Sequence, residues 1–492
     1  MSARCTLLCL ALAACSSPEL PPLQLETTHF RYHGRTPPTC SGLGEWLEHH
    51  YQTMSAALGV ELPAGGKIDI HTFADSADLA ENGCGAIQGV EPTGCADGTD
   101  TYSVQEYDPH ELIHAYASLL GDPPLFFKEG LAETLGCGIW ADDLAIERPA
   151  DVRPLLTTVG FRKLQGAAFF AAYGATADLT RWLIDVHGMG PFLAFYANTP
   201  EGAGWSELEA SFQAHVGGSL EAAIAAWEAS PPRTRGGVCL HLAECATPPF
   251  GDAGGTEVAH LACGPAVSPT TALAPLAIVR SFALPAPRRV TLHLAGDRPM
   301  SARLRSCNSE LHPAQHVTFL DGKPGELWTE LPAGDYWLAA YAGGADPGPG
   351  EVAPDTAVRL DLGAGEATTC AASPRAVAPE TVEVVLRGAF SVDQDVDPAD
   401  GTPDLSFPFT IDQPATLGIR TYSSDGVPYD GESAALCQGT CPGAGTCATG
   451  TLGQAPNLPF AGAPLTPGTV YDVTLQGRPG ALGAQLGLRF LR

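Results

Sequence analysis

Two histidines one helical turn apart are the residues of this 492-residue chain that most directly suggest chemistry. His110 and His114 stand at positions i and i+4, so on a helix both imidazoles project from one face. Such a pair can hold a single zinc ion, and Glu111 between them is placed to take a proton from a water that the zinc binds. A catalytic zinc site also needs a third protein ligand and one open position. Glu129, fifteen residues after His114, is the best candidate for that ligand.

The neighbouring residues predict the two helices that would position this motif. Asp108 followed by Pro109 is typical of a helix start, with an aspartate N-cap and a proline at the first helical position. The segment 121–124, Gly-Asp-Pro-Pro, predicts the end of that helix. A second helix opening near Leu125 carries the candidate glutamate and Glu133 one turn apart. Two short helices joined by a tight break can bring the ligands to one point. The alternative is an amphipathic surface helix with incidental histidines.

At these residues the chain resembles the gluzincin metallopeptidases, the group that contains the thermolysin-like enzymes. It is more closely similar to the bacterial peptidase-MA-like proteins, in which a W/F-x-E-G-L-A-E helix follows the HExxH helix. Residues 127–133, FKEGLAE, match that second element. The resemblance implies three zinc ligands: His110, His114 and Glu129. It also implies that Glu111 is the catalytic base and that Glu133 orients a zinc-bound histidine. The exchange of Glu129 and Glu133 between the two roles stays open.

The resemblance covers about residues 25 to 230. In related gluzincins a tyrosine at the head of a later helix stabilises the oxyanion, which implies this role for Tyr173; the alternative is a core tyrosine. Residues 205–227 resemble the closing helices of the family, joined by the turn at Gly217 and Gly218. The G-x-M-E-N segment of the aminopeptidase branch is missing. An endopeptidase that cleaves a peptide or protein substrate is therefore the expectation.

The acidic composition bears on the partners of this protein. The chain has 55 acidic and 26 basic residues, a formal net charge of −29. No basic patch is present to neutralise phosphates, which argues against binding of nucleic acid. The same charge disfavours adsorption of the protein body to anionic membranes. The sequence does not determine the oligomeric state.

The first residues read as a targeting segment. Residues 1–14 combine one cation with a short apolar run and predict a lipoprotein signal peptide. Cleavage before Cys15 would leave an acylated cysteine, followed by a tether over residues 15–27. We expect an exported protein, a bacterial outer-membrane or cell-surface lipoprotein that meets the membrane only through this anchor. The alternative is ordinary cleavage after Ala13 and a periplasmic or secreted protein.

The cysteines agree with export. Three of the 15 lie in or at the end of the targeting segment, and the other twelve form an even set. Disulfides are expected in an oxidising compartment. Pairing of Cys84 with Cys95 would brace the wall of the cleft beside the zinc helix. Three cysteines in a glycine-rich loop allow a rival interpretation as a second zinc site, although no histidine lies nearby: Cys437, Cys441 and Cys447.

Together these patterns predict an α+β chain, with a thermolysin-like (gluzincin) zinc peptidase domain over residues 28–230 followed by two β-sandwich domains. Residues 43–58 read as a helix, and 102–106 as the edge strand against which a peptide substrate lies. Period-two patterns after residue 250 predict sandwiches over 250–372 and 376–492. Both are loosely similar to pre-peptidase C-terminal modules.

An acidic cluster lies in the second of these sandwiches. Asp393, Asp395 and Asp397 stand at alternate positions, which suits Ca²⁺, and the other interpretation is a solvated acidic turn. The function expected for the whole chain is that of an exported, lipid-anchored zinc metallopeptidase. The alternative is a cell-surface binding or scaffold protein whose peptidase-like domain is inactive.

Overall fold

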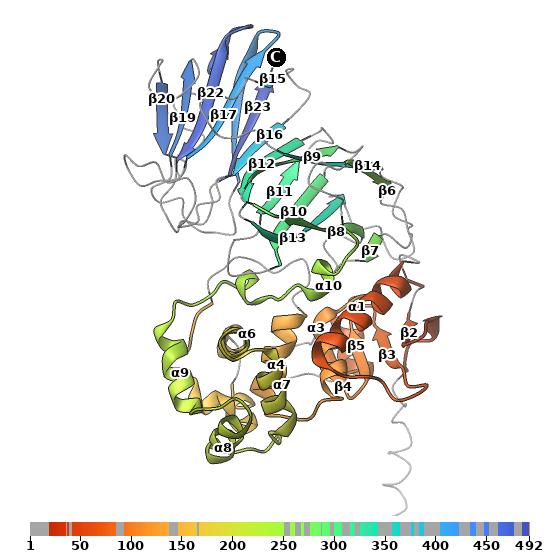
Figure 1. Cartoon of the computed structure of the whole chain (residues 1–492). Coiled ribbons are helices and arrows are strands. Elements are labelled where there is room, and N and C mark those ends of the chain that lie inside the picture. The colour runs from red at the N-terminus through yellow and green to blue at the C-terminus, as the bar shows by residue number, and fades with distance from the viewer. Residues whose placement is uncertain are drawn as a thin grey trace, which may run out of the picture.

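The computed structural model of the chain describes residues 19–249 except 36, 39–41, 85–92, 137–145 and 165–166, and beyond 249 the strands and some turns. Figure 1 shows a lower part that contains the helices and an upper part built of strands. The predicted targeting segment with Cys15 and the acidic cluster at 393–397 lie outside the described residues.

A five-stranded sheet opens the lower part, in the order β1-β2-β3-β5-β4. Its strands are β1 (Leu23–Glu26), β2 (Phe30–Gly34), β3 (Ile68–Thr72), β4 (Gly94–Asp97) and β5 (Asp100–Ser103). β2, β3 and β5 run parallel, whereas β1 and β4 are antiparallel to their neighbours. Alternate residues such as Phe30, Tyr32, Ile68 and Ile70 are buried, as the period of a half-buried strand requires.

The edge strand of this sheet differs from the expectation. β5 lies between β3 and β4, so the prediction that residues 102–106 form an edge strand is wrong. β4 is the outermost strand on that side, joined to β5 by a two-residue turn at Gly98 and Thr99. Gly98 has φ +60°, which a hairpin turn of this kind demands of at least one residue.

The helices of the lower part follow the sheet. They are α1 (Leu43–Leu58), α2 (Ser76–Asn82), α3 (Pro109–Ala117), α4 (Leu125–Leu135), α5 (Thr158–Phe161), α6 (Ala167–His187), α7 (Met189–Asn198), α8 (Trp205–His215), α9 (Leu220–Ala229) and α10 (Leu242–Cys245), with 3-10 turns at Arg153–Leu156 and Gly236–Val238. The predicted helix over 43–58 is confirmed as α1, and the turn at Gly217 and Gly218 separates α8 from α9.

One hydrophobic cluster connects the sheet with these helices. Its fully buried members include Leu47 of α1, Tyr116 of α3, Phe127 of α4 and Trp227 of α9. Ala243 of α10 belongs to the same cluster, so the elements that pack on this core extend past residue 230. α3 and α4 therefore pack against other elements of the core, which holds the side chains on them in defined positions.

Three further sheets make up the upper part of the chain that the structure describes. Their strand orders are β11-β10-β13-β8-β7, β21-β18-β23-β16-β12-β9-β14-β6 and β15-β17-β22-β19-β20. The strands are β6 (Thr256–His260), β7 (Val267–Pro269), β8 (Leu276–Leu284), β9 (Arg288–Ala295), β10 (Met300–Ser306), β11 (Gln315–Phe319), β12 (Gly325–Leu331), β13 (Gly334–Ala342), β14 (Ala357–Ala364), β15 (Arg375–Val377), β16 (Glu383–Arg387), β17 (Asp404–Ile411), β18 (Ala415–Tyr422), β19 (Ser433–Gln438), β20 (Cys447–Thr451), β21 (Pro464–Leu465), β22 (Val470–Gln476) and β23 (Gln485–Leu491). The eight-stranded sheet contains strands from both expected sandwiches, because β12 pairs in parallel with β16.

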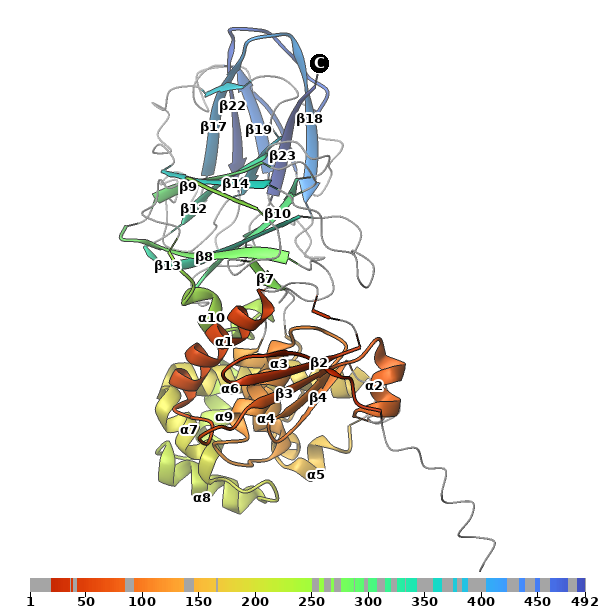
Figure 2. The ribbon, with the colours of Figure 1, turned by 90° about the vertical axis from the view of Figure 1, so that its right-hand side faces the viewer.

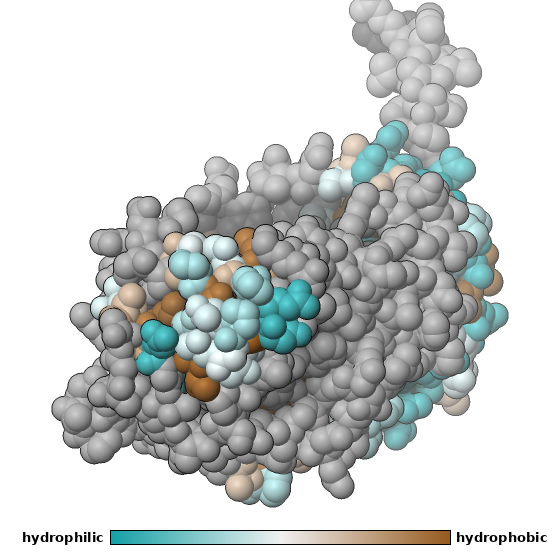
Figure 3. Space-filling view, turned by 90° about the horizontal axis from the view of Figure 1, so that it is seen from above, coloured by the Kyte–Doolittle hydropathy of each residue, from teal (hydrophilic) through white to brown (hydrophobic). Residues whose placement is uncertain are grey.

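The two parts meet at α1 and α10. Figures 1 and 2 show both helices directly beneath β7, β8 and β13. A disulfide joins Cys245 of α10 to Cys307 after β10, and a small apolar cluster around Trp337 packs against Trp46 of α1. Figure 3 looks onto the opposite, strand-built end, where the described residues form a mixed hydrophobic and hydrophilic surface. Among the described residues, no helix has the length and apolar character needed to span a bilayer.

Candidate metal centre

α3 begins as its sequence predicts. Asp108 is the N-cap, its carboxylate accepts a hydrogen bond from the backbone N–H of Glu111, and Pro109 opens the helix. Ser103 at the end of β5 donates a 2.7 Å hydrogen bond to the other Asp108 oxygen. The start of α3 is thereby attached to the sheet, and both histidines of the motif face the same side of the helix.

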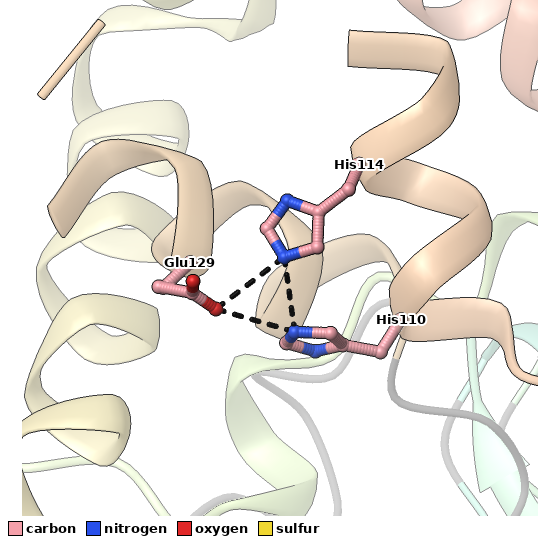
Figure 4. A group of neighbouring side chains, drawn as sticks. All are labelled: His110, His114 and Glu129. Atoms are coloured by element: carbon pink, nitrogen blue, oxygen red, sulfur yellow. Dashed lines mark hydrogen bonds and ion pairs between the residues drawn. The ribbon is translucent and has the colours of Figure 1, made fainter. Parts of the chain in front are cut away.

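Three side chains from α3 and α4 converge on one point. His110 and His114 of α3 place their Nε2 atoms 3.2 Å apart. Glu129 of α4 places its Oε2 atom 3.3 Å from Nε2 of His110 and 3.4 Å from Nε2 of His114. Figure 4 shows the two imidazoles pointing from one helix toward the carboxylate on the other. This group could bind a metal ion.

The dimensions of this triangle fit a tetrahedral ion. Bonds of about 2.0–2.1 Å at tetrahedral angles separate neighbouring ligand atoms by about 3.4 Å. The three distances between the ligand atoms, 3.2, 3.3 and 3.4 Å, match that separation. Two nitrogen ligands and one oxygen ligand also match the chemistry of a borderline-soft divalent cation. The residues present therefore fit a metal with one coordination position left for a small molecule.

Glu133 lies on the other side of His110. Its Oε1 atom is 3.4 Å from Nδ1 of His110, whereas Nε2 of the same ring faces Glu129. A carboxylate at Nδ1 holds the proton on that nitrogen and leaves Nε2 free to bind a cation. Of the two glutamates on α4, the geometry thus brings Glu129 to the histidine pair and places Glu133 behind the ring.

The electrostatics of the group reflect its crowded carboxylates. Burial would lower the pKa of His110, but the hydrogen bond to Glu129 and the charges of Glu133 and Glu111 outweigh it and raise this pKa to about 10. Burial would raise the pKa of Glu129, yet the two histidines hold it well below its usual range. This site accumulates negative charge around two imidazoles and so favours a cation.

Glu111 stands beside the triangle without belonging to it. Its side chain is buried, and burial raises its pKa to about 7 despite the opposing charge of His110, with a further increase from Asp108. A carboxyl group in this range can both accept and release a proton near neutral pH.

An open cavity of about 570 Å³ lies over these residues. Its wall includes both histidines, Glu111, Glu129 and Tyr173, together with all of β4 from Gly94 to Asp97. Tyr173 lies inside α6, with its ring centroid 6.4 Å from that of His110. Burial, followed by the charges of the nearby glutamates, raises the pKa of Tyr173, so its hydroxyl keeps its proton.

Other residues of the cavity wall are absent from the sequence-based site. They include Gly94, Asp97, Asp122, Leu125, Lys128, Arg162 and Tyr196. An edge strand at 102–106, as the sequence pattern predicts, leaves β4 out of the site. The Asp97-Gly98 dipeptide before an alternating segment is a hairpin signal that could have located it.

Two cysteine predictions are decided by the structure. Cys84 and Cys95 form a disulfide beside the cavity, as expected. Cys437 and Cys447 form a disulfide between β19 and β20, which overturns the rival zinc site, because disulfide sulfurs are not thiolate ligands.

Comparisons with known proteins add little to this geometry. No protein-family model and no curated protein matches the sequence. Among solved structures, the pre-peptidase C-terminal domain of a Bacillus anthracis collagenase is 15% identical, and the match covers 22% of this chain and 88% of that domain at a TM-score of 0.17. Tripeptidyl peptidase 2 is 12% identical over 48% of this chain and 23% of its own, at a TM-score of 0.15. The PBSX exported protein XepA is 11% identical, and the match covers 45% of this chain and 88% of that protein at a TM-score of 0.14. At these TM-scores the similarities carry no argument about fold or function.

Proposed function

We propose that this protein is a zinc-dependent peptidase of the glutamate-ligand (gluzincin) type. One observation carries the proposal: three ligand atoms form a triangle of tetrahedral dimensions, and the carboxylate of Glu111 stands beside it in an open cavity. A structural metal site is closed by four protein ligands, whereas this group supplies three and faces an open space. The arrangement therefore suits catalysis better than structural support.

Each side chain of the candidate centre has a role in this hydrolysis. A zinc ion held by His110, His114 and Glu129 would acidify a water and polarise the scissile carbonyl. Glu111 accepts the proton of the attacking water and passes it to the leaving amine. Tyr173 donates a hydrogen bond to the oxygen that gains negative charge. Glu133 keeps the ring of His110 in place through Nδ1.

The substrate class follows from β4. This strand pairs only with β5 among the described strands, so its outer edge offers backbone N–H and C=O groups beside the cavity. An extended peptide can pair with such an edge. β4 forms part of the cavity wall, so an extended peptide paired with this strand would pass the metal ligands, and we therefore infer an endopeptidase.

The cellular setting is part of the same proposal. The disulfides at Cys84–Cys95, Cys245–Cys307 and Cys437–Cys447 fit an oxidising compartment. Together with the targeting segment that the sequence predicts at residues 1–14, they support export, with a lipid on Cys15 as the proposed anchor.

Metal content tests the site. The mature wild-type protein should contain about one zinc per chain by mass spectrometry, because a full catalytic set is present. Glu129→Ala should lose the metal, since only two ligands remain. Unchanged zinc in Glu129→Ala would move the third ligand to another residue. The exposed Glu81 supplies the control, because Glu81→Ala removes a carboxylate that is not part of the cavity wall.

Turnover tests the reaction. Glu111→Gln should retain zinc and lose about 10²- to 10⁴-fold in kcat on a peptide library, because it removes the proton acceptor. Wild-type turnover in Glu111→Gln would refute its role as base. A zinc-loaded wild type that cleaves no peptide would favour a binding or scaffold protein.

A further inference from the structure

Gly94 of β4 lies directly against the side chain of Glu111. A Cβ atom built on Gly94 would be 2.7 Å from Oε1 of Glu111, 2.8 Å from its Cγ and 2.9 Å from Oδ2 of Asp108. These separations are shorter than any normal contact between such atoms. Only glycine therefore fits at this position without displacing the carboxylate of Glu111.

β4 is attached to the start of α3 by hydrogen bonds. Gly94 is the strand partner of Ser103, whose hydroxyl lies 3.1 Å from the carbonyl oxygen of Thr93 and 2.7 Å from Oδ2 of Asp108. The backbone N–H of Val104 also donates to the carbonyl of Thr93. Thr93, which precedes Gly94, and Asp108, the N-cap of α3, thus share Ser103 as a hydrogen-bond partner.

A covalent bond also holds β4 in place. Cys95, the residue after Gly94, forms a disulfide with Cys84, which follows the end of α2. α2 is itself attached to the protein core through the fully buried Leu79. An edge strand has a ladder partner on one side only, and β4 pairs with β5 over four residues. The disulfide supplies the second attachment.

We propose that β4, fixed by the Cys84–Cys95 disulfide, is a positioning strand for Glu111 and that Gly94 is its contact point. This inference rests on the proposed function, and it assigns to the disulfide a role in catalysis beyond stability. Gly94 packs directly against the side chain of Glu111. A shift of β4 therefore changes where the carboxylate of Glu111 lies relative to the histidine pair. A displacement of about 1 Å of a catalytic group can cost on the order of 100-fold in rate.

The test compares three variants of the full mature protein. They are Gly94→Ala, the double variant Cys84→Ser/Cys95→Ser, and the control Cys437→Ser/Cys447→Ser. The control removes a disulfide that closes a similar loop, with a sequence separation of 10 against 11, in the upper part of the molecule. Zinc content, Tm, kcat and KM are measured for each. Affinity for acetohydroxamate is measured on cobalt-loaded protein by visible absorption, because this chelator loses a proton when it binds the metal, and a carboxylate next to the metal strengthens binding by accepting that proton.

The first two variants should keep one metal per chain and an unchanged cobalt spectrum, because the three ligands are intact. Their kcat should fall about 10- to 100-fold with KM within about twofold, and their hydroxamate affinity should weaken. The control should match wild type in kcat and hydroxamate affinity. In addition, Glu111→Gln should weaken hydroxamate binding less in the Gly94→Ala background than in wild type, since the carboxylate is already displaced.

Several outcomes would overturn the inference. The inference fails if the Cys84→Ser/Cys95→Ser and Gly94→Ala proteins have the kcat and hydroxamate affinity of wild type. It also fails if the effects of Gly94→Ala and Glu111→Gln on hydroxamate affinity are additive. Loss of metal in these variants would show a general structural role instead. A wild type that binds metal and hydroxamate but cleaves no peptide refutes the proposed function alone, because the hydroxamate measurements still decide the positioning role. A wild type without metal refutes both.

Discussion

Each of the two ring nitrogens of His110 has a different carboxylate partner, and this arrangement defines the candidate centre. Nε2 faces Glu129 and the second histidine, whereas Nδ1 faces Glu133. The glutamate pair on α4 thus separates into one group at the ligand triangle and one behind it. Tyr173 completes the set from a third helix, α6, and lines the cavity with its ring centroid 6.4 Å from that of His110.

The role of Tyr173 can be tested by removing one oxygen. Tyr173→Phe keeps the ring packed against Phe161 and Phe169 and deletes only the hydroxyl donor. We expect kcat to fall about 10- to 1,000-fold with zinc content and KM close to wild type, because loss of one oxyanion donor acts on the transition state. Steady-state kinetics on the best library peptide give this result. Unchanged kcat would return Tyr173 to the role of a core residue.

At the scale of elements, the position of α4 depends on its close contact with α6. A Cβ atom on Gly130 would be 2.1 Å from Oγ1 of Thr180 and 2.6 Å from the carbonyl oxygen of Thr176. The helices can approach this closely only because residue 130 is glycine. Since Glu129 precedes Gly130 directly, the helix contact also sets the distance of its carboxylate from α3.

Gly130→Ala should therefore affect both stability and the metal site. Overpacking of this kind costs about 1–3 kcal/mol, which lowers Tm, and the shift of α4 should weaken zinc affinity. Differential scanning calorimetry and competition with a chelator measure the two effects. Gly190→Ala on α7 is the matched control, because nothing lies within 4 Å of its added Cβ and its stability should not fall. Unaltered Tm and zinc affinity in Gly130→Ala would contradict the close-contact argument.

At the scale of the whole molecule, α10 connects the helical part with the strands of the upper part. Glu244 of α10 is buried, with Nδ1 of His241 at 3.8 Å from its Oε2 and the charge of Arg305 nearby. Burial raises the pKa of Glu244 to about 7, although its own backbone N–H and Arg305 act in the opposite direction. The junction between the two parts therefore contains a carboxyl group that prefers its proton.

This preference predicts a pH dependence of stability. The folded-state pKa of Glu244 lies above its ordinary value of 4.5, so the folded protein binds this proton more tightly than the unfolded chain. Its contribution is complete below pH 4.5 and is lost as the pH rises through 7, by up to about 3 kcal/mol. Glu244→Gln cannot lose a proton at this position, so this decrease in stability should be absent. The Tm of the variant relative to that of wild type should therefore rise between pH 4.5 and 7.5. Parallel Tm curves of the two proteins would contradict the prediction, and the exposed Glu61→Gln supplies the baseline.

The features of this protein that could be predicted from the sequence are those that depend on short-range interactions. The Asp108-Pro109 start of α3, its end before residue 121 and the opening of α4 at Leu125 all follow from capping and proline chemistry within a few residues. The i, i+4 spacing of His110 and His114 follows from the helix alone. The strand-rich character of the chain after residue 250 was also readable, because the period of two is local.

The relations between distant segments became visible only in the folded chain. The fold placed Glu129 rather than Glu133 at the histidine pair, made β4 the edge strand, and joined β12 to β16 within one sheet. It also brought Gly94 into contact with Glu111. These outcomes depend on which surfaces pack and which strands pair across many residues. Such pairing is selected by burial and close packing of the whole core, and no local propensity encodes it.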